Sequence, residues 1–125
     1  DQFVPPDPLG VRPPPDLSRA CTSRTVRVAG QAVRLALLDT QGSELFRTIS
    51  TGQYMAADAV VLVFAHGGGP ESLSRCEVWW REAQKYTRGG APFVLAGNKC
   101  DQPVSPELRA RAARVAALMD DMPYI

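Results

Sequence analysis

Residues 39–64 read DTQGSELFRTISTGQYMAADAVVLVF, and this stretch decides the fold of the 125-residue chain. Its first part is polar and shows no clear hydrophobic periodicity, so we expect a loop followed by a short, irregular helix. Its last part, AVVLVF at residues 59–64, is continuously apolar and rich in β-branched side chains. This composition predicts a strand that is buried on both faces, as the strands of parallel sheets are.

The sequence after this strand predicts a helix and then a second strand. Residues 66–70, HGGGP, break the strand, and a proline followed by Glu71 suits the first turn of a helix. Apolar residues then recur at helical spacing, namely Leu73, Cys76, Trp80 and Ala83. The glycines at 89–90 end this helix, and residues 93–96, FVLA, predict a second buried strand.

Another helix and the start of a further strand follow. Ser105 is a typical N-cap, Pro106 suits the first helical position, and Glu107 is favourable in the first turn. The face of this helix that we expect to be buried consists of Leu108, Ala112, Val115 and Met119. Residues 123–125, PYI, are typical of the beginning of another strand.

The residues before position 39 predict a β-hairpin that follows an irregular segment. Residues 24–28 and 33–38 alternate between apolar and polar side chains, and Gly30-Gln31 between them suits a two-residue type II′ turn. One face of this hairpin is expected to be apolar. Residues 1–15 contain six prolines, so we expect an extended, exposed loop. Their PxxP pattern also occurs in ligands of SH3-type domains, but it is a weak pattern.

The order of these elements indicates an α/β fold. Strands that alternate with helices favour a mostly parallel sheet, to which the hairpin adds an antiparallel edge. We therefore expect a Pro-rich irregular segment at residues 1–23 and one α/β domain at residues 24–125. Hydrophobic residues make up 45% of the chain, which suffices for a core. The formal net charge of +1 creates no strong field, so we expect no nucleic-acid partner.

The chain contains few histidines and cysteines, the residue types that commonly bind zinc or form disulfides. There is one histidine, His66, and the cysteines are Cys21, Cys76 and Cys100. An odd number of widely spaced cysteines argues against a disulfide framework or a zinc site and fits a reducing compartment. We expect all four residues to be loop or core residues without chemistry.

Two polar motifs follow predicted strands, at the sheet edge where parallel α/β folds bind ligands. Residues 39–42 are DTQG, and residues 98–101 are NKCD. A carboxylate at a strand end can hold Mg²⁺ through a water, and a nearby glycine lets a backbone N–H approach a phosphate oxygen. A second aspartate can accept hydrogen bonds from the paired N–H donors of guanine, which adenine lacks. Either motif alone is weak, but both in this order favour a guanine-nucleotide site.

At these residues the sequence resembles the Rab-type small GTPases of the Ras superfamily. Residues 39–64 are similar to the family's DTAGQERFRTI, which is followed by YYRGA and an apolar strand. The segments PESLSRCEVWWREAQKY and VLAGNKCD are similar to the family's next helix and guanine motif. The resemblance covers residues 24–125 and implies a P-loop NTPase-like fold with a mostly parallel sheet and one antiparallel edge hairpin.

The resemblance implies a role for each residue that matches a family motif. Asp39 resembles the aspartate that holds Mg²⁺ through a water, and Gly42 resembles the glycine whose N–H contacts the γ-phosphate. Asn98, Lys99 and Asp101 resemble the residues that recognise guanine. The implied cofactors are GTP or GDP and Mg²⁺.

The chain also departs from the family pattern. The catalytic glutamine, which orients the attacking water, falls at Ser43, whose side chain is too short for this task. Gln41 is a substitute candidate at a different backbone position, and Pro8 stands where switch I has its threonine. The chain contains neither a GxxxxGK(S/T) phosphate-binding loop with its preceding first strand nor the Ser-Ala-Lys motif and last helix. We therefore expect these residues alone to be inactive as a GTP hydrolase.

The implied function is that of part of a Rab-like small GTPase. Such a protein is a guanine-nucleotide-dependent switch with GTP hydrolysis in vesicle and membrane traffic, at the cytosolic face of intracellular membranes. Effectors and regulators are expected at the switch II residues Phe46, Arg47 and Ile49, and membrane attachment would require a lipidated C-terminal tail that this chain lacks. Two alternatives stay open, namely a catalytically dead pseudo-GTPase that acts as a protein-binding module and an unrelated α/β domain. A surface ion pair is the alternative interpretation of Lys99 and Asp101.

Overall fold

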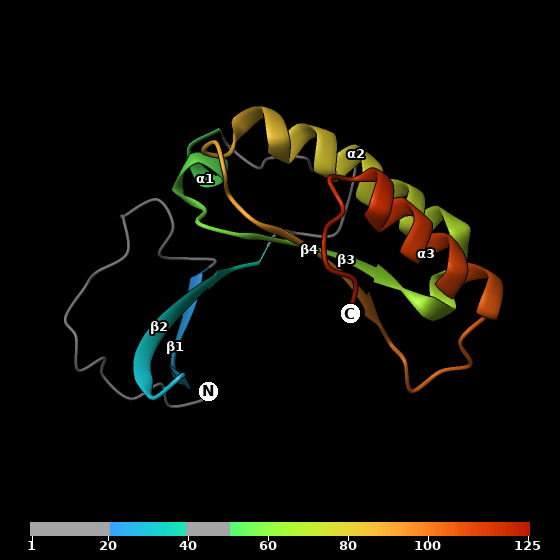
Figure 1. The fold of residues 1–125 in the computed structure, drawn as a ribbon, viewed down its shortest axis with the longest axis horizontal. Helices are drawn as coiled ribbons and strands as arrows, with labels where there is room; N and C mark the ends of the chain where they lie inside the picture. The colour runs from blue at the N-terminus through green and yellow to red at the C-terminus, as the bar shows by residue number, and fades with distance from the viewer. Residues whose placement is uncertain (1–20, 40–50) are drawn as a thin grey trace. The chain divides into compact units, whose positions relative to one another are not determined.

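The computed structural model describes residues 21–39 and 51–125. The chain forms two units, Asp1–Ile49 and Ser50–Ile125. The described part of the first unit is an antiparallel hairpin, and the second unit is a parallel strand pair with helices (Figure 1). The predicted combination of a parallel sheet with an antiparallel hairpin is confirmed, and the two are separate two-stranded sheets.

The hairpin of the first unit consists of β1 (Cys21–Val28) and β2 (Gln31–Leu38), so β1 begins before the expected Arg24. Directly opposed residues of an antiparallel pair project to the same face, and Val26 is opposed by Val33. This register gathers the apolar side chains on one face, as expected: Val26, Val28, Val33, Leu35 and Leu37. All of these except Val26 are exposed.

The turn of the hairpin differs from the prediction by one residue. Its central residues are Ala29 and Gly30, with φ angles of 49° and 79°, because Val28 is opposed by Gln31. Positive φ at both positions is typical of a type I′ turn, and the predicted type II′ turn at Gly30-Gln31 is therefore wrong. Glycine adopts this conformation without steric cost, whereas the alanine does so under strain.

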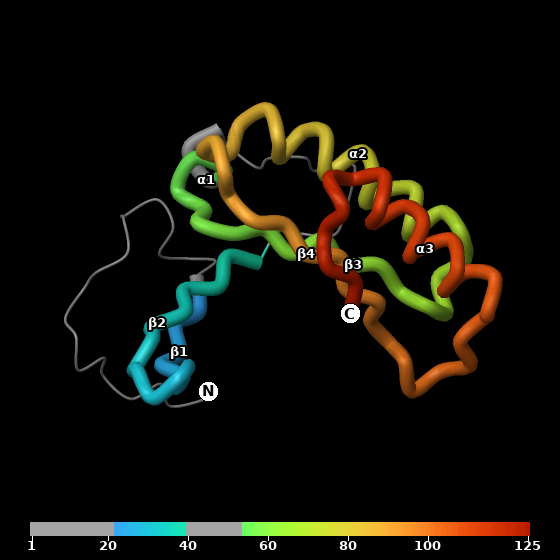
Figure 2. The backbone as a smooth tube through the Cα atoms, viewed as in Figure 1, coloured from blue at the N-terminus to red at the C-terminus, as the bar shows by residue number. Residues whose placement is uncertain are grey.

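The second unit holds a parallel strand pair. Its elements, in chain order, are α1 (Thr51–Ala56), β3 (Val60–Ala65), the 3₁₀ turn η3 (His66–Gly68), α2 (Pro70–Tyr86), β4 (Phe93–Asn98) and α3 (Pro106–Leu118). In the β3–β4 ladder, Leu62 is opposed by Leu95. Tyr124 also forms a parallel bridge with Leu95, so the C-terminal residues run beside β4 (Figure 2). This bridge confirms the predicted beginning of a further strand.

Helix α2 begins where the sequence predicts. Gly69 precedes it with a φ of 75°, Pro70 is its first residue, and Glu71 lies in its first turn. It ends at Tyr86, before the glycines at 89–90 that were expected to end it. No helix in the described part of the chain is long and apolar enough to cross a membrane.

Helix α3 has the predicted N-terminus and buried face. The hydroxyl oxygen of Ser105 accepts a hydrogen bond of 3.3 Å from the backbone N–H of Leu108. Pro106 is the first helical residue. The predicted face is buried in full: Leu108, Ala112, Val115 and Met119.

The core lies between the strands and the two long helices, which run side by side over one face of the β3–β4 pair (Figure 1). Phe64 and Leu95 enter it from the strands, and Leu73 enters it from α2. Leu73 and Leu95 are fully buried. Burial of such a side chain contributes about 1.5–3 kcal/mol to stability, so this cluster holds the second unit together.

The other face of β3 is open to solvent, which corrects the expectation that this strand is buried on both faces. Val61 and Val63 are 58% and 57% exposed, whereas Leu62 and Phe64 between them are buried. The cause is that α2 and α3 both pack on the same face of the strand pair. An apolar run predicts a strand, but the number of its covered faces depends on elements elsewhere in the chain.

Candidate functional site

The predicted guanine-recognition residues form one exposed loop. Strand β4 ends at Asn98, and a turn follows in which the N–H of Gln102 donates a hydrogen bond of 3.1 Å to the carbonyl oxygen of Lys99. Asn98, Lys99, Cys100 and Asp101 are all exposed. The three predicted residues, Asn98, Lys99 and Asp101, thus lie in one exposed stretch of four residues.

This loop lies at the carboxyl end of the parallel strand pair. Ala65, the last residue of β3, is opposed by Asn98. Ligands of open α/β sheets bind outside the carboxyl ends of strands. The loop therefore occupies the position that a ligand-binding loop takes in such a sheet.

Lys99 has an unusual backbone conformation. Its φ is 58°, in the left-handed region that few non-glycine residues adopt. Such conformations cost about 1–3 kcal/mol and cluster at functional sites. Between Lys99 and Asp101, both of which the structure describes, there is no ion pair, so the alternative interpretation of these residues as a surface ion pair finds no support.

Behind this loop lies a buried histidine, which we expected to be a loop or core residue without chemistry. His66 is 8% exposed, and its Nδ1 atom is buried without a hydrogen-bond partner. Its ring packs edge-on against Phe64, with 5.0 Å between the ring centroids. The only sequence signal was a histidine that directly follows an apolar strand, which does not by itself indicate a function.

The predicted magnesium residue lies in the other unit. Asp39 directly follows β2 and is exposed. Gln41, Gly42 and Ser43 lie outside the described residues, as do Phe46, Arg47, Ile49 and Pro8. In residues 21–39 and 51–125 no group of three His, Cys, Asp or Glu side chains could hold a metal ion. A single exposed carboxylate still fits Mg²⁺, which commonly takes one or two protein carboxylates and fills its other positions with phosphate oxygens and water.

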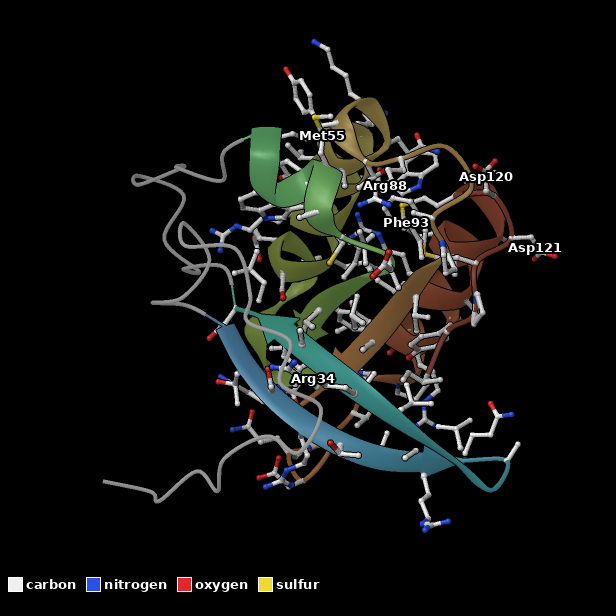
Figure 3. The ribbon with its side chains drawn as sticks, turned by 90° about the vertical axis from the view of Figure 1, so that its left-hand side faces the viewer. Arg34, Met55, Arg88, Phe93, Asp120 and Asp121 are labelled. Atoms are coloured by element: carbon white, nitrogen blue, oxygen red, sulfur yellow. The ribbon has the colours of Figure 1, made fainter. Side chains whose placement is uncertain are left out.

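Two hollows on the surface of the second unit lie away from the predicted loop. One, of about 470 Å³, is lined by Pro70, Glu71, Ser74, Arg75, Val78 and Arg111. Another, of about 410 Å³, lies at the amino end of β4, where Arg88, Phe93, Asp120 and Asp121 are labelled in Figure 3. Neither hollow is lined by a residue that the sequence predicts to bind nucleotide.

The cysteines differ in their surroundings. Cys76 is buried in the core, and burial raises the pKa of its thiol to about 11. Cys100 is exposed in the loop between Lys99 and Asp101. Both are free thiols, and of these two Cys100 is the one that a reagent in solution can reach.

A comparison with known families finds a match over most of the chain. The sequence model described as "Ras family" matches residues 16–125. The matched region includes β1, β2 and the whole of the second unit.

Comparison with individual proteins gives the same result. The chain is 31% identical over 102 residues to the GTP-binding protein YPTM1 of Zea mays, covering 82% of this chain and 49% of that protein. It is 29% identical over 102 residues to the GTP-binding protein YPT1 of Saccharomyces cerevisiae, again covering 82% and 49%. It is 32% identical over 94 residues to the Ras-related protein Rab-13 of Rattus norvegicus, covering 74% and 46%. The chain thus spans about half the length of these relatives.

Proposed function

The chain is a Rab-like member of the Ras family, and we propose that the protein containing it is a guanine-nucleotide-dependent switch that hydrolyses GTP in vesicle and membrane traffic. Its place of action in this proposal is the cytosolic face of intracellular membranes. The names of two relatives describe those proteins as GTP-binding, and this supports the nucleotide assignment.

One observation carries the proposal, namely the exposed loop at the carboxyl end of β4. The carboxylate of Asp101 is proposed to accept hydrogen bonds from the N1–H and the 2-amino group of guanine. The apolar stem of Lys99 is proposed to lie over the base, and the amide of Asn98 to hold the loop against the nucleotide. All three residues are exposed and lie within four positions of the chain, and this binding requires their exposure.

Phosphate and metal binding are proposed for residues of the DTQG motif. Asp39 would hold Mg²⁺ through a water, and the N–H of Gly42 would contact the γ-phosphate. When bound, Mg²⁺ neutralises charge on the phosphate oxygens. The exposure of Asp39 directly after a strand supports its part of this proposal.

Two regions of the chain are assigned by the same proposal. Residues 24–125 are part of the GTPase domain, and residues 1–23 are a Pro-rich segment at the switch I position. Effector and regulator proteins would bind the switch II side chains of Phe46, Arg47 and Ile49. Aromatic residues and arginine are enriched in protein interfaces, and this composition supports the proposal.

A pseudo-GTPase is the second candidate, and Ser43 is the observation that favours it. The Ser43 side chain is too short to hold a water in line with the γ-phosphate as a glutamine does. Gln41 could supply an amide, from a different backbone position. In this second candidate the protein binds guanine nucleotide or a partner protein without turnover.

The affinities of the full-length protein for nucleotides with two different bases test the nucleotide assignment. Asp101→Asn replaces one of the two accepting carboxylate oxygens with an NH₂ donor and removes the negative charge. We expect a roughly 100-fold loss of GDP affinity, since one guanine donor then faces another donor and the other keeps only a neutral acceptor. Xanthosine diphosphate carries a carbonyl in place of the 2-amino group, so its affinity should rise in the same variant. Asp121→Asn is the matched control, because this exposed carboxylate follows α3 at its far end and should change neither affinity. Equal affinities of wild type and Asp101→Asn for GDP would remove the proposal.

Single-turnover hydrolysis distinguishes the two candidates. A working GTPase should release phosphate from bound GTP in the wild-type protein, and Ser43→Gln should accelerate this release. Tight GTP binding with no release, and a gain of release only in Ser43→Gln, would establish the pseudo-GTPase.

A further inference from the structure

The loops that follow β3 and β4 interlock through two reciprocal contacts. In each contact, a side chain from one loop packs against a glycine. That glycine lies in the other loop or is the residue immediately before the other loop. His66, after β3, lies against Gly97, and Gln102, after β4, lies against Gly67. The two contacts flank residues 98–101, so they determine where this loop can lie.

The first contact depends on the absence of a side chain at Gly97. A Cβ atom added there would collide with the His66 ring, and it would also lie 2.9 Å from Cζ of Phe64 and 3.0 Å from Cε1 of His66. Gly97 directly precedes Asn98 in the strand, and Phe64 is its partner in the β3–β4 ladder. The imidazole therefore lies under the backbone from which the recognition loop begins.

The second contact has the same form in the opposite direction. A Cβ atom added at Gly67 would collide with the side-chain oxygen of Gln102. Gln102 is also the residue whose backbone N–H closes the turn onto Lys99. The turn is thus attached at its end to the backbone of η3.

The loop after β3 is itself fixed. The N–H of Ala65 donates a hydrogen bond of 2.9 Å to the hydroxyl oxygen of Ser72 in α2. Gly68 fits closely between Ala65 and Ser72, because a Cβ atom added at Gly68 would lie 3.3 Å from Cβ of Ala65. This loop therefore provides a rigid support for the residues packed on it.

Packing alone does not account for a histidine at position 66. The ring is 8% exposed, and its Nδ1 is buried with no hydrogen-bond partner. An aliphatic side chain of similar size would fill the same space without burying an unpartnered polar atom, which is unfavourable. The ring also packs against the backbone at Gly97, where its Nε2 and Cε1 atoms occupy the space that a side chain would need.

We propose that His66 and Gln102 are positioning residues that set the recognition loop, Asn98 to Asp101, for guanine. This inference rests on the proposed function, in which Asp101 accepts hydrogen bonds from the base. Neither residue contacts the nucleotide. Each acts through the backbone, since His66 supports the first residue of the loop and Gln102 holds its end.

Comparison of two bases measures how well the loop is placed. Guanine offers Asp101 both N1–H and a 2-amino group, whereas hypoxanthine offers only N1–H. The ratio of GDP to IDP affinity in the full-length protein therefore reports the alignment of Asp101 with the 2-amino group. We expect the wild-type protein to prefer GDP, and His66→Ala to lower GDP affinity at least tenfold and bring the ratio close to one.

One conservative variant of His66 and alanine variants of two glycines make the test more specific. His66→Gln retains a planar group against Gly97 and should keep most of the wild-type ratio. Gly97→Ala should lower the ratio as His66→Ala does, because its Cβ displaces the ring. Gly89→Ala is the matched control, since a Cβ there meets no atom within 4 Å, and it should leave both affinities unchanged.

The outcomes separate this inference from the proposed function. If the wild-type protein binds GDP and IDP equally weakly, the proposed function fails and this inference fails with it. If wild type prefers GDP, and His66→Ala and Gly97→Ala lower only the melting temperature while the ratio stays unchanged, then His66 is merely structural and this inference alone is overturned. Gln102→Ala changes an exposed side chain, so it folds even if His66→Ala does not. An unchanged GDP to IDP ratio in that variant would overturn the role of Gln102.

Discussion

Arg88 donates a hydrogen bond of 2.9 Å from Nε to the backbone carbonyl oxygen of Met55 (Figure 3). This bond joins the segment after α2 to the short helix α1. The hydroxyl of Tyr54 adds a second link by donating a hydrogen bond of 3.0 Å to Oε2 of Glu82. A six-residue helix is not stable alone, so α1 depends on these links to α2.

Loss of the Arg88 link should loosen α1 without unfolding the core. In Arg88→Ala the hydrogen bond to Met55 is lost, which we expect to cost about 1 kcal/mol and to accelerate local opening about fivefold. Hydrogen exchange of the backbone amides in α1 measures this effect. Arg81→Ala removes an exposed arginine of α2 and is the control. Equal exchange rates in both variants would show that the bond does not hold α1.

Removal of the α3 N-cap should destabilise the second unit. Ser105→Ala deletes the acceptor for the N–H of Leu108, and such a loss costs about 1 kcal/mol. Ser105→Thr retains the hydroxyl and should unfold close to the wild-type urea concentration. If the alanine and threonine variants unfold at the same urea concentration, the cap contributes nothing.

The same serine also gives a pH-dependent effect. Its hydroxyl donates a hydrogen bond of 2.7 Å to Oε2 of Glu107, and this bond, with a backbone hydrogen bond, lowers the pKa of that carboxyl. A lowered pKa in the folded state stabilises the fold at pH values above the pKa of the unfolded state, and this stabilisation disappears as the pH falls through the folded pKa. In Ser105→Ala we therefore expect the pKa of Glu107 to rise, as followed by NMR titration of its side-chain carboxyl carbon. An unchanged titration would contradict the role of Ser105.

Cys76 and Cys100 should react at very different rates. In a Cys21→Ser background, Cys100→Ser leaves only the buried thiol of Cys76, whose pKa is raised to about 11. Because the thiolate is the reactive form, this variant should resist a disulfide reagent at pH 8 until urea unfolds it. The partner variant, Cys76→Ser in the same background, leaves exposed Cys100 and should react at once. Rapid reaction of both variants in the folded state would mean that Cys76 is not in the core.

Because the backbone of Lys99 is left-handed, we expect glycine to be more stable than alanine at this position, which is the reverse of the usual order. Glycine adopts a φ of 58° without penalty, whereas alanine retains the strain. Lys99→Gly should therefore be more stable than Lys99→Ala by about 1 kcal/mol in urea unfolding. At the neighbouring Cys100, which has no positive φ, the order should reverse, with alanine more stable than glycine. The same order at both positions would contradict the strain at Lys99.

Local sequence signals predicted the elements of the second unit well. The N-cap at Ser105, the first turn at Pro70 and the buried stripe of α3 depend on residues within a few positions of each other, so the sequence carries them directly. The hairpin turn is different, because Gly30 suits either of two turn types, and pairing between the strands decides which residue is central. The structure places it in a type I′ turn with Ala29.

Non-local packing accounts for what the sequence did not predict. The exposure of Val61 could not be derived from an apolar run, since it depends on which face the helices cover. The contact of His66 with Gly97 joins the loop after β3 to a residue of β4 that is far away in the chain, and no periodicity predicts it. The NKCD loop was found from residue order alone, but its left-handed Lys99 was visible only in the structure.

The open face of β3 has a consequence for the behaviour of this chain in solution. Val61 and Val63 present branched apolar side chains side by side to water, and strand edges and apolar faces that meet water promote association between molecules. The colloidal behaviour of the isolated 125 residues will therefore depend strongly on concentration. Kosmotropic salts such as sulfate strengthen apolar burial, so they will precipitate this chain at concentrations that leave a protein with both sheet faces covered in solution.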